Sequence, residues 1–320
     1  MSLLKTLAVS FTLVCAPVAA LAQAYPAKPI RIIVPYSAGG GADNAARVLA
    51  PRLSQQLGQP VIIENRAGGS GSIGANAVAR AEADGYTVLY DASTLAVNPS
   101  LRKLPFDAKN DLVPVSLAIT VPNILVVPAN APYKTVGEFI DQARKKPGDM
   151  TYASYGAGSP AHLIGELLKT QAKIDMLHIP YKGGAPALID VMGGQVNAYF
   201  ANAASGMNYV KSGKLRALAV TSSRRMAALP DVPTLAESGF ANFEVLEWNG
   251  FFVPKGTPKD IVARLTKEVQ AAVRDPATRA KLQGMGLDPV GSSSEEFSKF
   301  VNGEMSRWAS LIKTNNITAE

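Results

Sequence analysis

The chain repeats one pattern along most of its length: a short apolar run, a loop with glycine or proline, and a segment with helical spacing. The first apolar run, 30–34, ends at Pro35, and Leu49, Leu53 and Leu57 then fall on one face of a helix. Short apolar runs of this kind are typical of buried strands. Strands that alternate with helices predict an α/β fold built on parallel sheets.

The same pattern predicts elements through the rest of the chain. Further strands are expected at 61–63, 86–90, 124–127, 151–154, 174–179, 196–200 and 215–220. Helices are expected from about Asp43 and at 73–83, 135–146, 161–170 and 186–192, followed by two amphipathic C-terminal helices. Pro51 is expected to kink the first helix or to end it early.

The length of 320 residues is more than one hydrophobic core usually supports, and it indicates two domains. Since no linker rich in Pro, Gly or Ser separates them, we expect one domain to be inserted in the other. The net charge of +7 is modest, and the densest basic cluster is Arg144, Lys145 and Lys146. Proteins that bind nucleic acids concentrate their basic residues more strongly, so we expect no nucleic acid partner.

Residues 1–24 have the composition of a secretory signal peptide. Lys5 precedes an apolar run that Pro17 interrupts, and small residues offer cleavage sites after about Ala22 or Ala24. A membrane anchor is the alternative, although the apolar run is short; Cys15 lacks the small preceding residue of a lipoprotein site. Cleavage would remove Cys15, the only cysteine, so we expect an exported protein without disulfides.

One motif suggests a nucleotide site. Gly69–Gly74 matches the dinucleotide pattern G-x-G-x-x-G, and Asp91 stands about where a ribose-binding acid would. Five residues separate Ile63 from Gly69, however, which is too many for the tight turn from strand to helix. We therefore favour a surface turn and expect no cofactor.

Common catalytic motifs are absent from the sequence. It has neither a G-x-S-x-G elbow nor a phosphate-binding loop, and its two histidines, His162 and His178, have no zinc-binding spacing. His162 stands at a helix start and is expected to help build a ligand site, whereas His178 is expected to be structural. No catalytic or metal-binding residue is predicted, and an exported hydrolase or isomerase that uses His162 is the alternative.

Two matching loops carry the main functional signal. Residues 35–41 (PYSAGGG) and 155–160 (YGAGSP) each follow a strand, contain Tyr, Gly and Ser, and lead into a helix. Free amide N–H groups and the helix dipole make such junctions anion sites, and glycine lets the backbone approach a ligand. Neither loop contains Lys or Arg, so amides and hydroxyls would hold the anion. One loop in each domain suggests a ligand with two acidic ends.

A series of ordered motifs extends along the chain. They are YPAKPI at 25–30, GGGAD at 39–43, ENRAG at 64–68, DGYT at 84–87, TYAS at 151–154, GSPAHL at 158–163, PYKGG at 180–184, GKLRALAV at 213–220 and DVPT at 231–234. From Tyr25 to its C-terminus the chain resembles the substrate-binding receptors of tripartite tricarboxylate transporters, the Bug or TctC-like family.

The resemblance implies a two-lobed type II periplasmic-binding-protein fold with a ligand cleft between the lobes. We expect 25–124 and 250–320 to form lobe 1 and 125–249 to form the inserted lobe 2, with Trp248 and Asn249 near the hinge. The resemblance also implies that both loops hold ligand carboxylates. The expected ligand-binding residues are Tyr36, Ser37, Ala38, Gly39 and Gly40 in the first loop, Ser154, Tyr155, Gly156, Gly158, Ser159 and His162 in and after the second, and Tyr181, Gly183, Gly184, Ala201, Asn202 and Ser205 in the walls.

Two positions depart from the family pattern. The strand that ends at Phe200 is usually followed by Asp-Asn but here by Ala201-Asn202, and the first loop has Ala38 where Pro is common. If Ala201 faces the cleft rather than packing beneath the strand, it offers no negative partner to an ammonium group. We then expect a ligand without an amino group, such as an aliphatic or aromatic dicarboxylate.

The expected function is that of a monomeric periplasmic receptor rather than an enzyme. It would capture a small carboxylate and present it to the membrane subunits of a tripartite tricarboxylate transporter. An orphan receptor that reports to a sensor protein is a further alternative.

Overall fold

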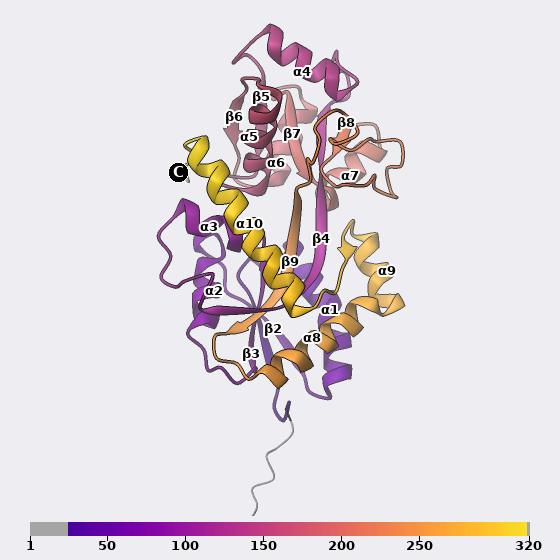
Figure 1. The fold of residues 1–320 in the computed structure, drawn as a ribbon. Coiled ribbons are helices and arrows are strands. Elements are labelled where there is room, and N and C mark those ends of the chain that lie inside the picture. The colour runs from indigo at the N-terminus through magenta and orange to yellow at the C-terminus, as the bar shows by residue number, and fades with distance from the viewer. Residues whose placement is uncertain (1–24, 319–320) are drawn as a thin grey trace, which may run out of the picture.

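A computed structural model describes residues 25–318 of the chain. The chain forms two α/β lobes, one above the other in Figure 1, which are joined by two long strands and crossed by the C-terminal helix. The expected signal peptide, with Cys15, lies outside the described residues. Within residues 25–318, no helix is both long enough and apolar enough to span a membrane.

The lower lobe is built around parallel strands. Its first elements are β1 (Ile30–Val34), α1 (Gly41–Leu57), β2 (Val61–Asn65), the 3-10 turn η1 (Gly69–Gly71), α2 (Ser72–Ala79), β3 (Thr87–Ala92) and α3 (Thr94–Leu101). β1 pairs in parallel with both β2 and β3, as the alternation of strands and helices predicts. Ile32, Ile33 and Val34 are all buried because both faces of this sheet are covered.

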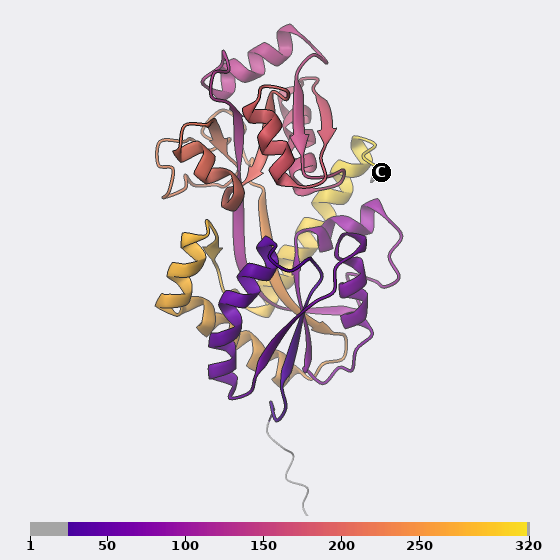
Figure 2. The same ribbon diagram turned by 180° about the vertical axis from the view of Figure 1, so that it is seen from behind.

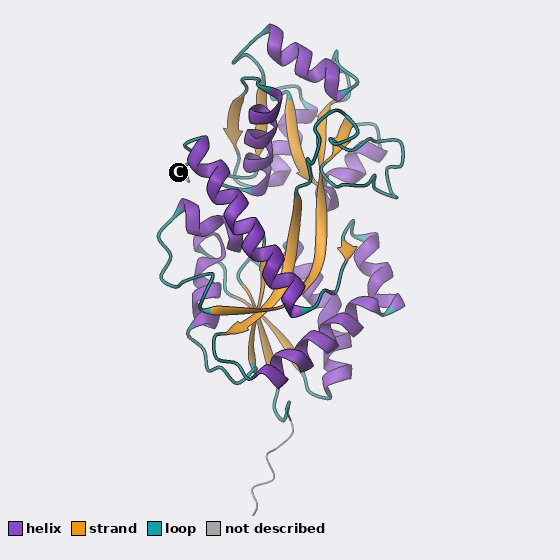
Figure 3. Ribbon diagram, viewed as in Figure 1, coloured by secondary structure: helices purple, strands orange, loops and turns teal. Residues whose placement is uncertain are grey.

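Two antiparallel strands, β4 (Leu112–Pro128) and β9 (Leu246–Pro254), connect the lobes (Figure 3). From Leu112 to Pro122, β4 pairs with β9. From Asn123 onward it pairs with β7 (Ala198–Asn202) and β8 (Leu215–Val220) instead. One strand therefore belongs to the sheets of both lobes.

The upper lobe repeats the order of strand and helix. Its elements are α4 (Val136–Lys145), β5 (Thr151–Ser154), α5 (Pro160–Ala172), β6 (Leu177–Pro180), α6 (Gly184–Met192), β7, α7 (Ala203–Lys211) and β8. β5 lies between β6 and β7 and is parallel to both. Each of these strands ends at a loop that leads into a helix, which places the helix starts along one edge of the sheet.

The C-terminal part of the chain returns to the lower lobe. It contains α8 (Lys259–Arg274), α9 (Pro276–Gly284), β10 (Asp288–Pro289) and α10 (Ser294–Thr314). Ser293 and Glu296 form a capping box that fixes the start of α10. From there α10 crosses to the upper lobe and packs against α3, β4 and α5 (Figure 1).

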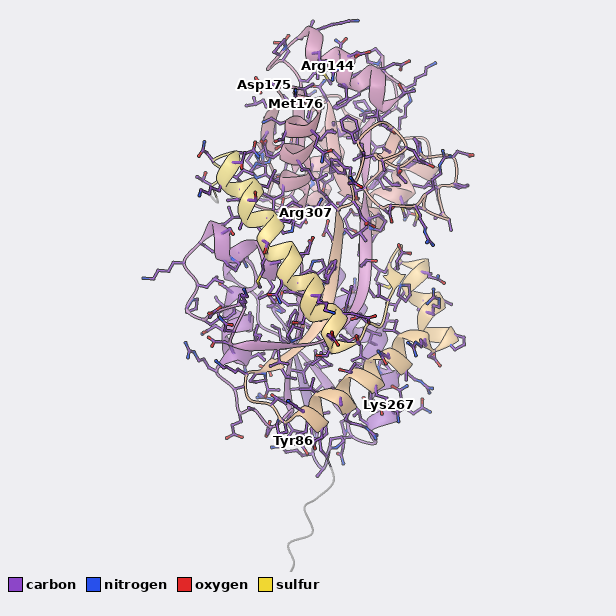
Figure 4. The ribbon with its side chains drawn as sticks, viewed as in Figure 1. Tyr86, Arg144, Asp175, Met176, Lys267 and Arg307 are labelled. Atoms are coloured by element: carbon purple, nitrogen blue, oxygen red, sulfur yellow. The ribbon has the colours of Figure 1, made fainter. Side chains whose placement is uncertain are left out.

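Two hydrogen bonds hold α10 along its path between the lobes. Arg307, which Figure 4 labels on α10 at the level where the lobes meet, donates from Nη1 to the backbone oxygen of Glu244 at 2.6 Å. Farther up, the Thr170 hydroxyl of α5 donates to Asn315 Oδ1 at 3.0 Å. The last helix is therefore bonded both to the segment before β9 and to the upper lobe.

The structure confirms the α/β class but differs from the sequence prediction in several elements. α1 runs through Pro51 to Leu57. Pro51 is exposed, so water can hydrate the carbonyl of Arg47 that loses its helical partner. β4 begins at Leu112 rather than 124, and α3, α7 and α9 were not predicted because their small or polar residues give little helical periodicity. The domain boundaries at 124/125 and 249/250 stay a prediction.

The packing of β9 beneath α10 leads to a stability prediction. A Cβ atom at Gly250 would collide with the ring of Phe297 and lie 3.0 Å from the carbonyl oxygen of Ser116. Gly250→Ala should therefore lower the free energy of unfolding by about 1–3 kcal/mol in urea denaturation. Gly137→Ala in α4 is the matched control, because its Cβ would meet only Thr135 Oγ1, at 3.9 Å. Equal stabilities of the two variants would contradict this account of the packing.

Candidate functional site

A cavity of about 920 Å³ is lined by residues of both lobes and of the two crossing strands. This volume suits a small organic ligand. Val121 of β4 and Glu247, Trp248 and Asn249 of β9 form the part of its wall that belongs to the crossing strands. The cavity therefore lies where β4 changes partners from one sheet to the other.

Five helices begin at the wall of this cavity. They are α1, α3, α5, α6 and α7, each of which follows a strand of its own lobe. Figure 2 shows the start of α1, in indigo, directed toward the upper lobe. The wall residues at these five starts are Gly40, Gly41, Ala42, Ser93, Thr94, Pro160, Gly183, Gly184, Ala185, Asn202, Ala204 and Ser205. The positive ends of five helix dipoles therefore meet around one space.

Three of the five helix starts lack a side-chain cap. The N-cap residues Gly40, Ser93 and Gly183 make no capping hydrogen bond through a side chain. Ser159 and Asn202, by contrast, cap α5 and α7. Uncapped amide N–H groups at a helix start bind anions readily, so the wall provides donors for a carboxylate or a similar group.

The cavity wall contains no cationic side chain and one acidic side chain. None of the lining residues is Lys, Arg or His, and Glu247 is the single acid among them. Burial raises the pKa of Glu247, whereas Asn202, Tyr155 and Asn123 beside it favour its charged form. Its Oε1 atom is buried and has no hydrogen-bond partner within residues 25–318. Anion binding here would therefore depend on backbone dipoles rather than on formal charges.

A buried carboxyl group supports the lower wall. The Tyr36 hydroxyl donates to Asp91 Oδ1 at 2.7 Å and also lies within hydrogen-bond distance of the Thr94 hydroxyl. The amide of Ala92 donates to the same Asp91 oxygen at 2.7 Å. Burial raises the pKa of Asp91 to about 7, although both hydrogen bonds lower it. Asp91, considered above as a ribose-binding acid, is thus committed to holding Tyr36.

The structure brings part of the predicted site together at the cavity. The predicted residues that line it are Tyr36, Gly40, Tyr155, Gly183, Gly184, Asn202 and Ser205, with Trp248 and Asn249 beside them. The other predicted residues do not line it; they are Ser37, Ala38, Gly39, Ser154, Gly156, Gly158, Ser159, His162, Tyr181 and Ala201. Each loop thus reaches the wall with only some of its predicted residues.

The second loop is held from behind by residues that were expected to touch ligand. The Ser154 hydroxyl is buried, hydrogen-bonds to His178 Nε2 at 2.7 Å and accepts from the Gly156 amide at 3.1 Å. His162 stacks on His178 with ring centroids 3.7 Å apart, and its Nδ1 accepts from the Gly158 amide at 3.0 Å. These contacts fix the loop so that Tyr155 reaches the cavity.

Two residues that were predicted in the walls, Tyr181 and Ala201, instead make contacts within the protein. The Tyr181 hydroxyl donates to Asp190 Oδ2 at 2.6 Å. Ala201 is fully buried, and a Cβ at Gly206 of α7 would lie 2.8 Å from the Ala201 Cβ. Ala201 therefore packs beneath its strand, and the structure gives no support for a contact between Ala201 and ligand.

The sequence analysis missed several residues of the wall. Ser93 and Thr94 follow β3 in the same way that the two predicted loops follow β1 and β5, and that position was the signal that could have found them. Glu247 and Tyr199 gave no such signal because each lies within an ordinary strand pattern. Their place at the cavity depends on how β9 and β7 pair with β4.

His162, the residue on which the alternative of an enzyme rested, does not line the cavity. Burial, with a contribution from His162, lowers the pKa of His178 to about 3, and burial also lowers the pKa of His162. Ser154, His162 and His178 all lie off the cavity wall. Among the described residues, no three His, Cys, Asp or Glu side chains cluster as metal ligands do.

Comparison with known proteins identifies a consistent set of relatives. The family model described as "Tripartite tricarboxylate transporter family receptor" matches residues 45–317. The protein BugT of Bordetella pertussis is 40% identical over 305 residues, which cover 94% of this chain and 92% of BugT. The family model and BugT thus both match most of the length of this chain.

Solved structures agree with the sequence matches. The periplasmic binding protein BugD has a TM-score of 0.77 and 35% identity, over 92% of this chain and 100% of that chain. An R. palustris protein solved with adipate has a TM-score of 0.81 and 35% identity, over 92% of this chain and 99% of that chain. These similarities confirm the two-lobed periplasmic-binding-protein fold with its cleft.

The raised pKa of Asp91 predicts a pH dependence of stability. The folded protein keeps the proton on Asp91 up to about pH 7, whereas the unfolded chain releases it near the usual value of 3.8. Because the folded state binds more protons in this window, this contribution to stability is full below about pH 4 and is lost as the pH rises through 7.

Asp91→Asn should remove this contribution, since the amide can still accept from Tyr36. We expect the free energy of unfolding, measured in urea, to fall between about pH 5 and pH 8 in wild type. In the variant this fall should be smaller, by on the order of a few kcal/mol. Asp231→Asn, at an exposed aspartate, is the control. If Asp91→Asn and wild type lose stability equally, Asp91 titrates near its ordinary value.

Proposed function

The chain belongs to the tripartite tricarboxylate transporter receptor family, and from this membership we propose that it is a periplasmic solute receptor that captures a small carboxylate. The observation that supports the carboxylate most directly is the meeting of five helix N-termini at one cavity, three of them without a side-chain cap. Backbone amides arranged in this way favour an anionic group.

The strength of such a site can be judged from its donors. A hydrogen bond to a charged group contributes about 1.5–3 kcal/mol. A few such bonds from α1, α3 and α6, less the cost of ordering, correspond to micromolar affinity, or about −8 kcal/mol. This range is suited to a receptor that must also release its ligand.

The more specific features of the function are also part of the proposal. The receptor would be exported after cleavage near Ala22 or Ala24, act as a monomer and deliver its ligand to the membrane subunits of a tripartite tricarboxylate transporter. A dicarboxylate is one candidate ligand, since a neighbour was solved with adipate. Lobe 1 (25–124 and 250–320) and lobe 2 (125–249) would close on it by bending at β4 and β9.

Binding without turnover is the first test of this function. Candidate carboxylates at known concentration are titrated into the protein by calorimetry and then recovered and analysed by mass spectrometry. We expect one ligand to bind per chain and to be recovered unchanged, because Ser154, His162 and His178 lie off the cavity wall. Conversion of the ligand to a product would establish an enzyme instead.

A variant at the start of α1 tests which surface holds the carboxylate. Gly41 lines the cavity, and a Cβ atom there would meet nothing within 4 Å. Gly41→Val should therefore fold normally, yet its side chain would obstruct the α1 amides and weaken carboxylate binding by about tenfold or more.

The control for this variant is Gly303→Val in α10. Its Cβ would also meet nothing within 4 Å, and Gly303 does not line the cavity. Both variants should be compared with wild type by thermal denaturation and by calorimetry. Undiminished affinity in a folded Gly41→Val protein would exclude the α1 terminus as the carboxylate site.

A further inference from the structure

Glu247 adds an acidic group to a cavity wall that is otherwise formed around positive helix ends. It stands on β9, paired with Val121 of β4, and both residues line the cavity. The helix starts around it present positive dipole ends, whereas Glu247 presents the one acidic side chain of the wall. A ligand that carried only negative groups would match the helix starts but would oppose a charged Glu247.

Three buried polar atoms at and beside Glu247 have no hydrogen-bond partner among the described residues. Its Oε1 atom is buried without a hydrogen-bond partner among the described residues, and so are both amide atoms of the neighbouring Asn123. Asn123 is fully buried and does not line the cavity, whereas Glu247 does. Buried polar atoms in folded proteins are nearly always hydrogen-bonded, so the unpaired Glu247 oxygen is a position at which a ligand can supply the partner. A carboxylate oxygen accepts hydrogen bonds, so its missing partner is a donor.

No protein cation is placed to neutralise Glu247 within the cavity wall. The groups that face it are the Tyr155 hydroxyl from the second loop, Tyr199 from β7, Asn123 from β4 and Asn202 at the start of α7. Burial raises the pKa of both tyrosines, so they are neutral at ordinary pH. The Glu247 carboxyl therefore has neutral neighbours only, and a cationic partner would have to come with the ligand.

We infer that Glu247 receives a protonated amino group of the ligand, so that the receptor prefers carboxylates that carry an amino group to dicarboxylates of similar length that lack one. This inference rests on the proposed function, because the carboxylate end is assigned to the helix starts. It replaces the expectation based on Ala201, which is buried beneath its strand. The ligand class becomes a zwitterion: a carboxylate bound by α1, α3 or α6, and an ammonium group at β9.

Matched pairs of ligands test this preference. Succinate is compared with aspartate, glutarate with glutamate, and adipate with 5-aminopentanoate by calorimetry on the full mature chain. At least one amino-carboxylate should bind more tightly than its partner by about tenfold or more, which is the usual value of a charged hydrogen bond. If no member of any pair binds, the proposed carboxylate receptor itself fails, whereas equal or tighter binding of succinate, glutarate and adipate, which lack an amino group, overturns only the role of Glu247.

Glu247→Gln isolates the contribution of the charge. The variant should lose the preference, binding the amino-carboxylate at least about tenfold more weakly and the dicarboxylate equally or more tightly. Glu244→Gln is the matched control, because Glu244 is exposed, lies three residues earlier and does not line the cavity. An unchanged ratio of affinities in a folded Glu247→Gln protein would overturn the inference.

The pH dependence of binding gives a second readout that needs no change in the ligand. Burial raises the pKa of the free Glu247 carboxyl, and a bound ammonium group would lower it, so binding should release protons and strengthen as the pH rises through that pKa. A ligand carboxylate beside Glu247 would instead cause proton uptake. Asp91 and the ligand titrate equally in wild type and Glu247→Gln, so the difference between the two proteins reports Glu247. Proton uptake attributable to Glu247 would contradict the inference.

Discussion

The antiparallel pairing of β4 with β9 is the interaction on which both lobes depend. β4 is hydrogen-bonded to β9 in one sheet and to β7 and β8 in the other, and its side chains are buried along almost the whole strand. The change of partner falls between Pro122 and Asn123. Val121 and Glu247 pair at the neighbouring position, so the cavity wall and the crossover share the same residues.

The helix starts around the cavity follow from the same architecture. In each lobe, parallel strands end at one edge of the sheet, and the next helix begins there. Two such edges face each other because β4 and β9 join them, and five N-termini meet as a result. No Lys, Arg or His lines this cavity, so under the proposed function an anion would be held by these dipoles. Under these conditions a single acid such as Glu247 can decide which ligands bind.

Residues that do not line the cavity hold the lining residues in position. Asp91 orients Tyr36, and the stacked pair of His162 and His178 with Ser154 holds the second loop in shape. On the opposite side of the crossing strands, α10 packs against elements of both lobes. Burial raises the pKa of Asp91 to about 7, so the protonation of the group that orients Tyr36 depends on the pH near neutrality.

The sequence by itself determined the α/β class, most strands, and the two loops at helix starts, because periodicity and turn residues are local properties. It located Tyr36, Gly40 and Tyr155 at the cavity for the same reason. Only the tertiary structure decided which neighbours of these residues face outward: Ala201 packs beneath its strand, and His162 stacks behind its loop. Glu247 reaches the cavity through the register of β9 on β4, which joins positions more than a hundred residues apart, and no local pattern encodes a pairing of that range.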